Sequence, residues 1–341
     1  MRAAIFNPYL DTLGGGERYT LGVASTLQEA GYDVCLEWKN IEIKNKLEKR
    51  FGLDLSGINF IPDVGRGNGY DVCFWVSDGS VPVLHARKNF LHFQIPFHNV
   101  KGNSLINKMK LIRINKIICN SIFTKMFIDK EYGVNSVVLY PSVNVEKIKP
   151  KRKSNAILFV GRFSQLTQAK NQNILIRAFK NFYDKGYRDW ELILAGGIEV
   201  GVGDYITKLE KMAQGYPVKL VTSPSFKELV LLYGEAKIFW SAVGFGASEE
   251  KEPEKMEHFG ISVVEAMAAG CVPIVFNGGG YKEIVKNGES GFLWDKESEL
   301  IRRTELLVND RRALREMSSK GKKISESFGH ERFAKEFISL I

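Results

Sequence analysis

The sequence has few cysteines and no long apolar run, and both absences limit what the protein can be. No two cysteines have the spacing of metal ligands, so buried free thiols in a reducing compartment are expected at Cys35, Cys73, Cys119 and Cys271. No apolar run approaches the roughly 20 residues that cross a bilayer. The N-terminus becomes polar too soon for a signal peptide and is typical of a buried strand. These features predict a cytoplasmic protein.

Several catalytic patterns are also missing. The sequence contains no P-loop, no Ser-His-Asp arrangement and no cluster of metal ligands, so neither a metal nor a resident cofactor is expected. It has no internal repeat and no low-complexity tract. Its 341 residues, 44% hydrophobic and 26% charged, are typical of a globular protein with room for two domains.

Acidic residues are absent between Asp78 and Asp129, although the whole chain has a net charge of only +9. Apolar residues interleave with the basic ones over 105–112, which favours peripheral contact with the inner face of an anionic membrane. A solvated basic face is the alternative, and nucleic acid is disfavoured because no recognition helix or aromatic platform accompanies the charge. The eight basic residues are Arg87, Lys88, Lys101, Lys108, Lys110, Arg113, Lys116 and Lys125.

Strand-like and helix-like segments alternate along the chain in two series. The segment 147–155 between the series is charged, contains Pro150 and has few apolar residues, which is typical of a linker. The pattern predicts an α/β protein with two doubly wound, Rossmann-like domains and parallel sheets covered on both faces. We place the domains at 1–148 and 149–328, followed by a last helix within 329–341.

Two carboxylates eight positions apart form the most informative motif. Glu257 precedes a glycine and an apolar run, and Glu265 lies inside the helix predicted over 261–269. A helix start offers free N–H groups and about half a positive charge, which suits a diphosphate. The carboxylates can then hold hydroxyls of a sugar or a ribose. A chance acid on an amphipathic helix is the plain alternative.

This segment resembles the paired-glutamate signature of retaining GT-B glycosyltransferases of family 4, also called glycosyl transferases group 1. Within that family it looks most like the mannosyltransferases that extend lipid-linked oligosaccharides. The resemblance covers nearly the whole chain and implies two domains that face each other across a cleft, with the last helix crossing back to the first domain. It assigns sugar hydroxyls to Glu257, the ribose to Glu265, and donor contacts to Phe259, Gly260 and Ile261.

Further donor contacts follow from the same resemblance. Arg162 and Lys170, after the first strand of the second domain, are similar to the family's pair of basic residues that stabilise the leaving diphosphate. The loop 164–169 between them is longer than in common members. Ser223 lies in a loop whose backbone would contact the nucleotide base. The glycines 278–280 predict either room for the sugar or a tight strand-to-helix turn.

In the first domain, Gly15 and Gly16 open the first helix, where backbone N–H groups can approach the donor phosphates and the acceptor. A mere turn is the alternative. His92 and His98 lie near a strand end, where relatives often place a histidine close to the donor sugar. We favour His92 as the catalytic one, although a lone histidine is more often a core or surface residue.

Together these features predict a metal-independent, retaining hexosyltransferase that uses a nucleotide-diphospho sugar. GDP-mannose is the favoured donor, a UDP-sugar is possible, and the acceptor is a glycan or a lipid-linked compound such as a cell-envelope polysaccharide precursor. Two other functions stay open. One is a UDP-sugar 2-epimerase of the same fold, and the other is a non-catalytic subunit that binds a nucleotide sugar.

Overall fold

The computed structural model divides the chain into two compact units. It describes residues 1–12, 14–165, 168–199 and 203–341. Unit 1 comprises Met1–Ser142 with His330–Ile341, and unit 2 comprises Val143–Gly329. The change of unit thus falls between Ser142 and Val143, slightly before the position 148–149 expected from the linker composition.

Unit 1 is built on a seven-stranded sheet in the order β3-β2-β1-β4-β5-β6-β7. Every neighbouring pair is parallel, which requires a crossover between successive strands and explains the alternation seen in the sequence. The strands are β1 (Arg2–Phe6), β2 (Asp33–Glu37), β3 (Ile58–Ile61), β4 (Val72–Val76), β5 (Lys88–Phe93), β6 (Lys116–Cys119) and β7 (Val137–Val138).

Both faces of this sheet are buried. Ala3 and Ile5 of β1 belong to one apolar cluster and Ala4 belongs to another, because successive side chains of a strand point to opposite faces. The described helices of unit 1 are α1 (Gly15–Glu29), α2 (Ile43–Phe51), α3 (Leu105–Leu111), α4 (Ile122–Tyr132) and α12 (His330–Leu340), with short 3-10 helices η1 (Leu10–Thr12) and η2 (Gly65–Gly67).

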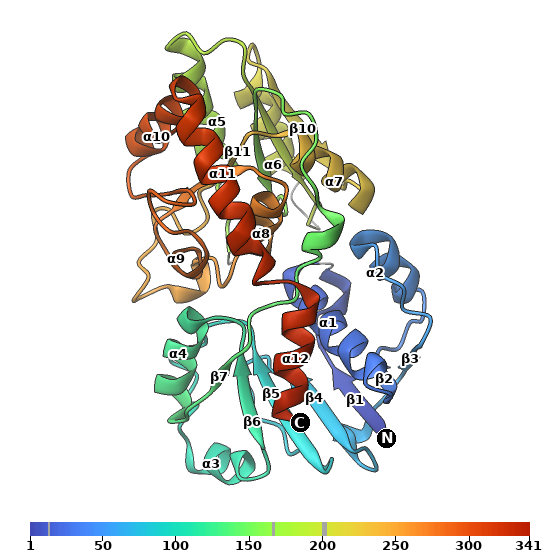
Figure 1. Ribbon diagram of the computed structural model, residues 1–341. Coiled ribbons are helices and arrows are strands. Elements are labelled where there is room, and N and C mark those ends of the chain that lie inside the picture. Colours follow the sequence, from blue (N-terminus) through green and yellow to red (C-terminus); the bar gives the residue numbers. More distant parts are fainter. Residues whose placement is uncertain (13, 166–167, 200–202) are drawn as a thin grey trace. The chain divides into compact units, whose positions relative to one another are not determined.

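The last helix, α12, packs into the core of unit 1 beside α1 (Figure 1). Phe333 meets the ring of Tyr19 edge-on, with centroids 5.4 Å apart, and Phe337 meets Phe74 at 5.9 Å. All four rings are fully buried or nearly so. Burying such side chains stabilises the unit by roughly 2 kcal/mol each, so α12 is an integral part of it.

Helix α3 is a feature that the sequence did not predict as a helix. Ser104 caps it by accepting a hydrogen bond from the backbone N–H of Asn107, and none of its residues is buried. The seven residues are too few for a clear helical period, which is why they were recognised only as apolar residues among lysines. Among the described helices, none has the length and apolar character of a bilayer span.

Unit 2 has a six-stranded sheet in the order β10-β9-β8-β11-β12-β13, again parallel throughout. Its strands are β8 (Ala156–Val160), β9 (Glu191–Gly196), β10 (Val218–Thr222), β11 (Ile238–Ser241), β12 (Val272–Phe276) and β13 (Phe292–Trp294). Its described helices are α5 (Gln172–Asp184), α6 (Gly203–Ala213), α7 (Phe226–Glu235), α8 (Ile261–Ala268), α9 (Tyr281–Ile284), α10 (Glu297–Asn309) and α11 (Arg311–Glu326), with η3 (Val145–Lys147) and η4 (Pro253–Lys255).

This topology determines where the polar loops of unit 2 meet. The loops that follow β8, β11 and β12 leave the same edge of the sheet, because all of these strands run in one direction. In open parallel sheets that edge is the usual place for a ligand. The loop after β8 carries Lys170, and the loop after β11 carries Glu257.

Candidate active site

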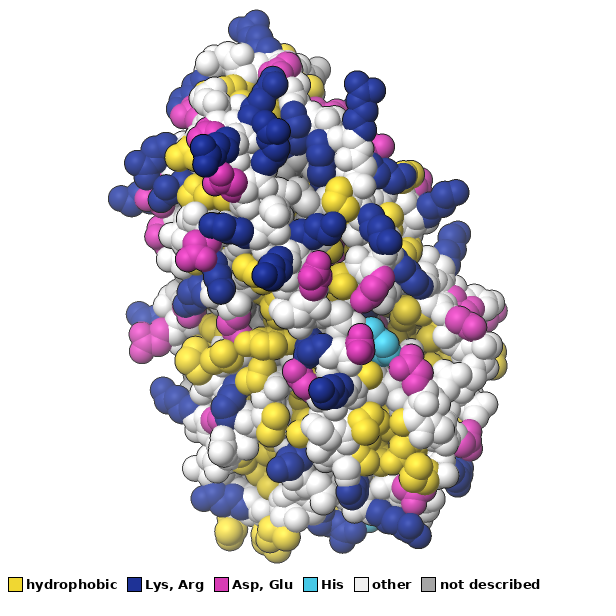
Figure 2. Space-filling model, in the orientation of Figure 1, with side chains coloured by type: hydrophobic (Ala, Val, Ile, Leu, Met, Phe, Trp, Pro, Cys, Tyr) yellow, Lys and Arg dark blue, Asp and Glu magenta, His cyan; other side chains and the backbone are white. Residues whose placement is uncertain are grey.

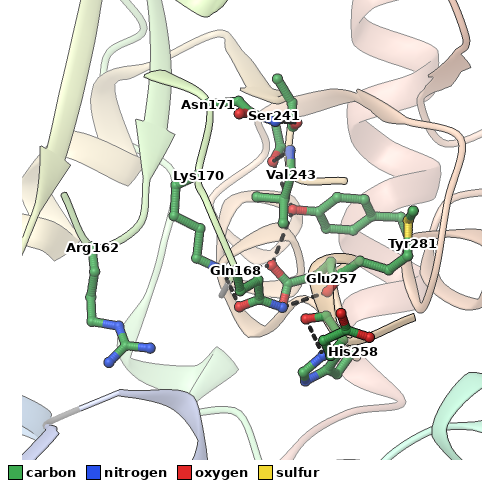
Figure 3. A network of polar contacts seen from close by, with 12 residues as sticks. Arg162, Gln168, Lys170, Asn171, Ser241, Val243, Glu257, His258 and Tyr281 are labelled. Atoms are coloured by element: carbon green, nitrogen blue, oxygen red, sulfur yellow. Dashed lines mark hydrogen bonds and ion pairs between the residues drawn. The ribbon is translucent and has the colours of Figure 1, made fainter. Parts of the chain in front are cut away.

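Glu257 and Lys170 form an ion pair at this edge of unit 2. The Nζ atom of Lys170 lies 3.2 Å from Oε2 of Glu257, and the two side chains are only 11% and 18% exposed. Figure 3 shows the lysine reaching across from one loop to the carboxylate on the other. Folding therefore brings together a cation and an anion that the sequence predicted separately, 87 positions apart.

Gln168 holds the same ammonium group from another side. Its Oε1 atom accepts a hydrogen bond of 2.6 Å from Lys170, and its amide donates to the backbone carbonyl of Met256. Gln168 thus ties the loop after β8 to the residue before Glu257. Of the loop 164–169, residues 166 and 167 lie outside the described residues. Sequence reasoning missed this role because glutamine in a loop has no distinctive pattern.

Tyr281 contacts Glu257 from α9. Its hydroxyl lies 3.4 Å from Oε2 of the carboxylate and 2.7 Å from the hydroxyl oxygen of Ser241 (Figure 3). Burial, assisted by the charge of Glu257, holds the pKa of the Tyr281 phenol well above its usual value. The phenol therefore stays protonated near neutral pH and can donate a hydrogen bond. The sequence did not predict that Tyr281 and Ser241 belong to this site.

Glu265 is held by a second tyrosine. The hydroxyl of Tyr233, on α7, donates a 2.8 Å hydrogen bond to Oε2 of Glu265, which is 7% exposed. A carboxylate this buried must be hydrogen-bonded, since an unpaired one is costly in a low-dielectric interior. The tyrosine also restricts the side-chain rotation of Glu265, which leaves the acid in a defined position on α8.

Helix α8 begins at Ile261, the residue at which the sequence predicted it to begin, and Gly260 is its N-cap. Gly260 has a φ of +113°, and a Cβ atom there would lie 2.8 Å from Cε1 of Tyr281. Both the backbone conformation and the close approach require glycine. Phe259, proposed as a donor contact, instead buries its ring against Phe328 with centroids 5.4 Å apart. The predicted contact of Phe259 with the donor would therefore be made by its backbone.

The glycines 278–280 form a tight turn against the backbone that carries Glu257. A Cβ atom on Gly279 would lie 2.2 Å from the carbonyl oxygen of Glu257, and one on Gly280 would lie 2.5 Å from Cα of Phe259. The N–H of Gly280 donates a 2.8 Å hydrogen bond to the Glu257 carbonyl. Of the two readings of these glycines, the structure supports close packing of the turn, because protein backbone fills the space beside it.

We expect Gly280→Ala to lower the free energy of unfolding by about 2 kcal/mol or more, as overpacking against a backbone does. Its φ lies in the ordinary helical region, so the effect would be steric alone. Urea denaturation measures it. Gly203→Ala is the matched control, since a Cβ there meets no described residue within 4 Å, and the substitution should be neutral or slightly stabilising. Equal effects of the two substitutions would contradict the packing argument.

Arg162 lies at the start of the loop that carries Lys170, and Ser223 lies in the loop after β10. In Figure 3 the Arg162 side chain lies to the left of Lys170 and Glu257, and no dashed line joins it to the residues drawn. Its backbone carbonyl accepts a 2.8 Å hydrogen bond from Gln172, which fixes the start of the loop. Ser223 has a φ of +51°, and its N–H donates to the carbonyl of Gly196 at the end of β9.

In unit 1, Gly15 and Gly16 begin α1. The N–H of Gly14 donates a hydrogen bond to the carboxylate of Glu17, so the side chain of Glu17 caps the N-terminus of α1. A Cβ on Gly16 would lie 2.2 Å from Oε1 of Gln94. In the structure, the side chain of Gln94, from the same unit, occupies the space beside Gly16. The predicted approach of Gly16 to a phosphate remains untested.

His92 lies where the sequence-based hypothesis does not place it. It is fully buried, its ring stacks on Tyr19 with centroids 4.1 Å apart, and its Nδ1 bonds to the carbonyl of Ile118. Burial lowers the pKa of His92 to about 3. This position argues against contact with a donor sugar and for a neutral core histidine, the alternative that we weighed. His98 is half-buried.

The described residues contain no group of three or more His, Cys, Asp or Glu side chains that could hold a metal ion. All four cysteines are free and buried. For Cys73 and Cys119, burial raises the pKa of the thiol to about 12, which keeps both in the unreactive thiol form.

Two parallel-sheet α/β units, with a carboxylate pair around the start of a helix in the second, define a sugar-transferring enzyme of the GT-B fold. The family described as Glycosyl transferases group 1 matches residues 143–324, which is more than half of the chain. The chain belongs to this family. The predictions of the family, of the GT-B α/β fold and of a glycosyltransferase of the hexosyltransferase class are confirmed.

Two distant relatives cover nearly all of this chain. The chain is 24% identical to an uncharacterized glycosyltransferase of Haemophilus influenzae, over 97% of both chains. It is 23% identical to the GDP-Man:Man(3)GlcNAc(2)-PP-Dol alpha-1,2-mannosyltransferase of Dictyostelium discoideum, over 98% of this chain and 83% of the relative. Among solved structures, Anabaena Alr3699/HepE in complex with UDP-glucose matches 100% of both chains with a TM-score of 0.77 and 18% identity.

Proposed function

We propose that this glycosyltransferase moves a hexose, with mannose favoured, from a nucleotide-diphospho sugar to a glycan or lipid-linked acceptor, with retention of configuration and without a metal. The pair of Lys170 and Glu257 beside the start of α8 carries the proposal. It places a cation, a carboxylate and a helix N-terminus together on the unit that matches the family.

The chemistry assigned to these groups follows from their charges. When the sugar leaves, negative charge grows on the diphosphate, and the ammonium of Lys170, the guanidinium of Arg162 and the N–H groups at the start of α8 stabilise it. Glu257 accepts hydrogen bonds from the sugar hydroxyls, and Glu265 accepts them from the ribose. The acceptor attacks the face from which the diphosphate departs. Tyr281 and Tyr233 orient the two carboxylates.

The donor is inferred from the relatives. The Dictyostelium relative is named as a GDP-mannose enzyme, whereas the Anabaena structure contains UDP-glucose. The Dictyostelium relative is 23% identical over 98% of the chain, against 18% for the Anabaena structure, so GDP-mannose is favoured and a UDP-sugar is second. The loop that contains Ser223 would meet the base through its backbone, which suits either nucleotide.

Thermal shifts with GDP, UDP and ADP at matched concentration test the donor class. A nucleotide at about a hundred times its dissociation constant should add roughly 2.7 kcal/mol of stability to the folded protein. We expect GDP to raise the melting temperature most. The effect should be lost in Glu265→Ala and reduced in Tyr233→Phe, because the first removes the ribose ligand and the second its support.

Tyr216→Phe is the matched control, since the Tyr216 hydroxyl bonds to Asp184 on the surface and should not affect nucleotide binding. If none of the three nucleotides stabilises the protein, the nucleotide-sugar proposal fails. Product analysis with the donor alone separates a transferase from a 2-epimerase, which needs no acceptor. Tight binding without turnover on any acceptor would instead favour a non-catalytic subunit.

A further inference from the structure

Helix α3 presents an apolar face to solvent. Leu105, Ile106, Met109 and Ile112, the last directly after the helix, are 75, 66, 65 and 83% exposed. At about 100° per residue these four side chains fall within roughly 120° of the helix circumference. Leu111 points to the opposite side and packs on the buried cluster of unit 1. We call the four exposed residues the α3 face.

The segment before α3 is fastened to unit 1. The carboxylate of Glu131, on α4, accepts hydrogen bonds of 2.9, 3.0 and 2.9 Å from the backbone N–H groups of Asn99, Val100 and Gly102. Gly102 also packs on Tyr132, where a Cβ would lie 2.8 Å from the ring. The amide of Asn107 donates to the Gly102 carbonyl. These contacts hold the α3 face outward instead of letting it fold back onto the core.

Four basic residues accompany the α3 face in this segment. Lys101, Lys108 and Arg113 are exposed and Lys110 is half-buried. The sequence has no acidic residue between Asp78 and Asp129, and the carboxylate of Glu131 is bonded to the backbone on both sides of Lys101. Figure 2 shows hydrophobic side chains protruding beside Lys and Arg where Figure 1 labels α3.

This combination selects one kind of partner. Exposed aliphatic side chains beside several cations match an anionic bilayer, in which the acyl region takes the apolar groups and the headgroups take the lysines. Four aliphatic groups have no use on nucleic acid. A second copy of the chain would meet the same positive charge and be repelled.

We propose that α3 is a membrane-docking element that inserts its apolar face at the boundary between the headgroups and the acyl chains of a bilayer rich in anionic phospholipid. The inference does not depend on the donor or on the proposed reaction, because it rests on the surface of unit 1 alone. It predicts that the protein binds to phospholipid vesicles, which can be measured directly.

The test is co-sedimentation of the full chain with vesicles of phosphatidylcholine alone or with 30% phosphatidylglycerol. We expect binding to the anionic vesicles only, weaker at high salt because exposed charges are screened. Lys108→Gln with Lys110→Gln should weaken binding roughly 25-fold, at about fivefold for each lysine near the surface. The double change Lys320→Gln with Lys322→Gln, on exposed residues of α11, is the matched control and should change binding little.

The apolar contribution is tested with Leu105→Gln, Met109→Gln and Ile112→Gln combined, which should abolish binding while the melting temperature stays near that of the wild type. Leu306→Gln, at an exposed site of unit 2, is its control. Because all four native cysteines are buried, Met109→Cys can carry a single polarity-sensitive dye, and its emission should shift to the blue on anionic vesicles.

Three results would overturn the proposal. They are no binding to either vesicle, binding that survives in both the lysine and the apolar variants, and a wild-type dimer that the apolar variant dissociates. The last result would make the α3 face an interface between copies of the chain.

Discussion

Lys170→Ala is expected to lower kcat/KM by about 100- to 1,000-fold, the loss typical when one preorganised charge at a developing anion is removed. Two effects contribute. The leaving diphosphate loses the ammonium group, and Glu257 loses the partner 3.2 Å from its Oε2 atom in a largely buried place. Steady-state kinetics with the preferred donor measure the change. The fall should appear in kcat more than in KM, because the charge develops mainly in the transition state.

Lys219→Ala is the matched control for this substitution. Lys219 also pairs with a glutamate, Glu191, but its side chain is 63% exposed on β10, and activity should change less than about twofold. Glu257→Gln tests whether the two groups act as a unit. If they do, kcat/KM of the variant that carries both substitutions should be only slightly lower than that of the less active single variant. A Lys170→Ala enzyme with normal kcat would contradict the assignment.

The stability of the protein should depend on pH through His92. The pKa of this histidine is lowered from 6.5 to about 3 by burial, so the unfolded chain binds the proton more readily between these values. The contribution of His92 is complete above pH 6.5 and is lost as the pH falls towards 3. From about pH 7.5 to about pH 5, the loss amounts to roughly 2 kcal/mol by proton linkage.

Urea denaturation across this range, compared between wild type and His92→Phe, measures the effect. Phenylalanine can keep the stack on Tyr19 but cannot titrate, so the variant should show a stability curve flatter by about 2 kcal/mol. It should also be less stable at pH 7.5, since the hydrogen bond to the Ile118 carbonyl is lost. The exposed His85, changed to Gln, is the control and should leave the slope as it is. An unchanged slope in His92→Phe would disprove the burial argument.

Local patterns in the chain were sufficient for several features. Alternating strands and helices predicted two parallel-sheet units, because each element must bury an apolar face of characteristic period. The spacing of Glu257 and Glu265 around a helix start indicated a polar site in unit 2, and the family resemblance added Lys170, which the structure pairs with Glu257. Gly260 was recognisable because a glycine before an apolar run commonly begins or ends an element.

Other features depended on contacts between distant residues. Nothing near Tyr281, Tyr233 or Gln168 in the sequence signals that each would bond to a site residue, since those partners lie on other elements. The tight packing of Gly280 against Phe259 arises only when two loops meet. Such pairings follow from the order of strands in a sheet, which local composition does not encode.

His92 and α3 show the same division most clearly. A histidine near a strand end can lie either in an active site or in the hydrophobic core. The stacking of Tyr19 on the His92 ring shows that His92 lies in the core. An apolar stretch among lysines is compatible with either a buried or an exposed face, and the anchoring by Glu131 decided for exposure. Residue types and their periods determined which elements form. Tertiary packing alone decided which side chains are removed from water, because burial depends on neighbours that only the folded chain supplies.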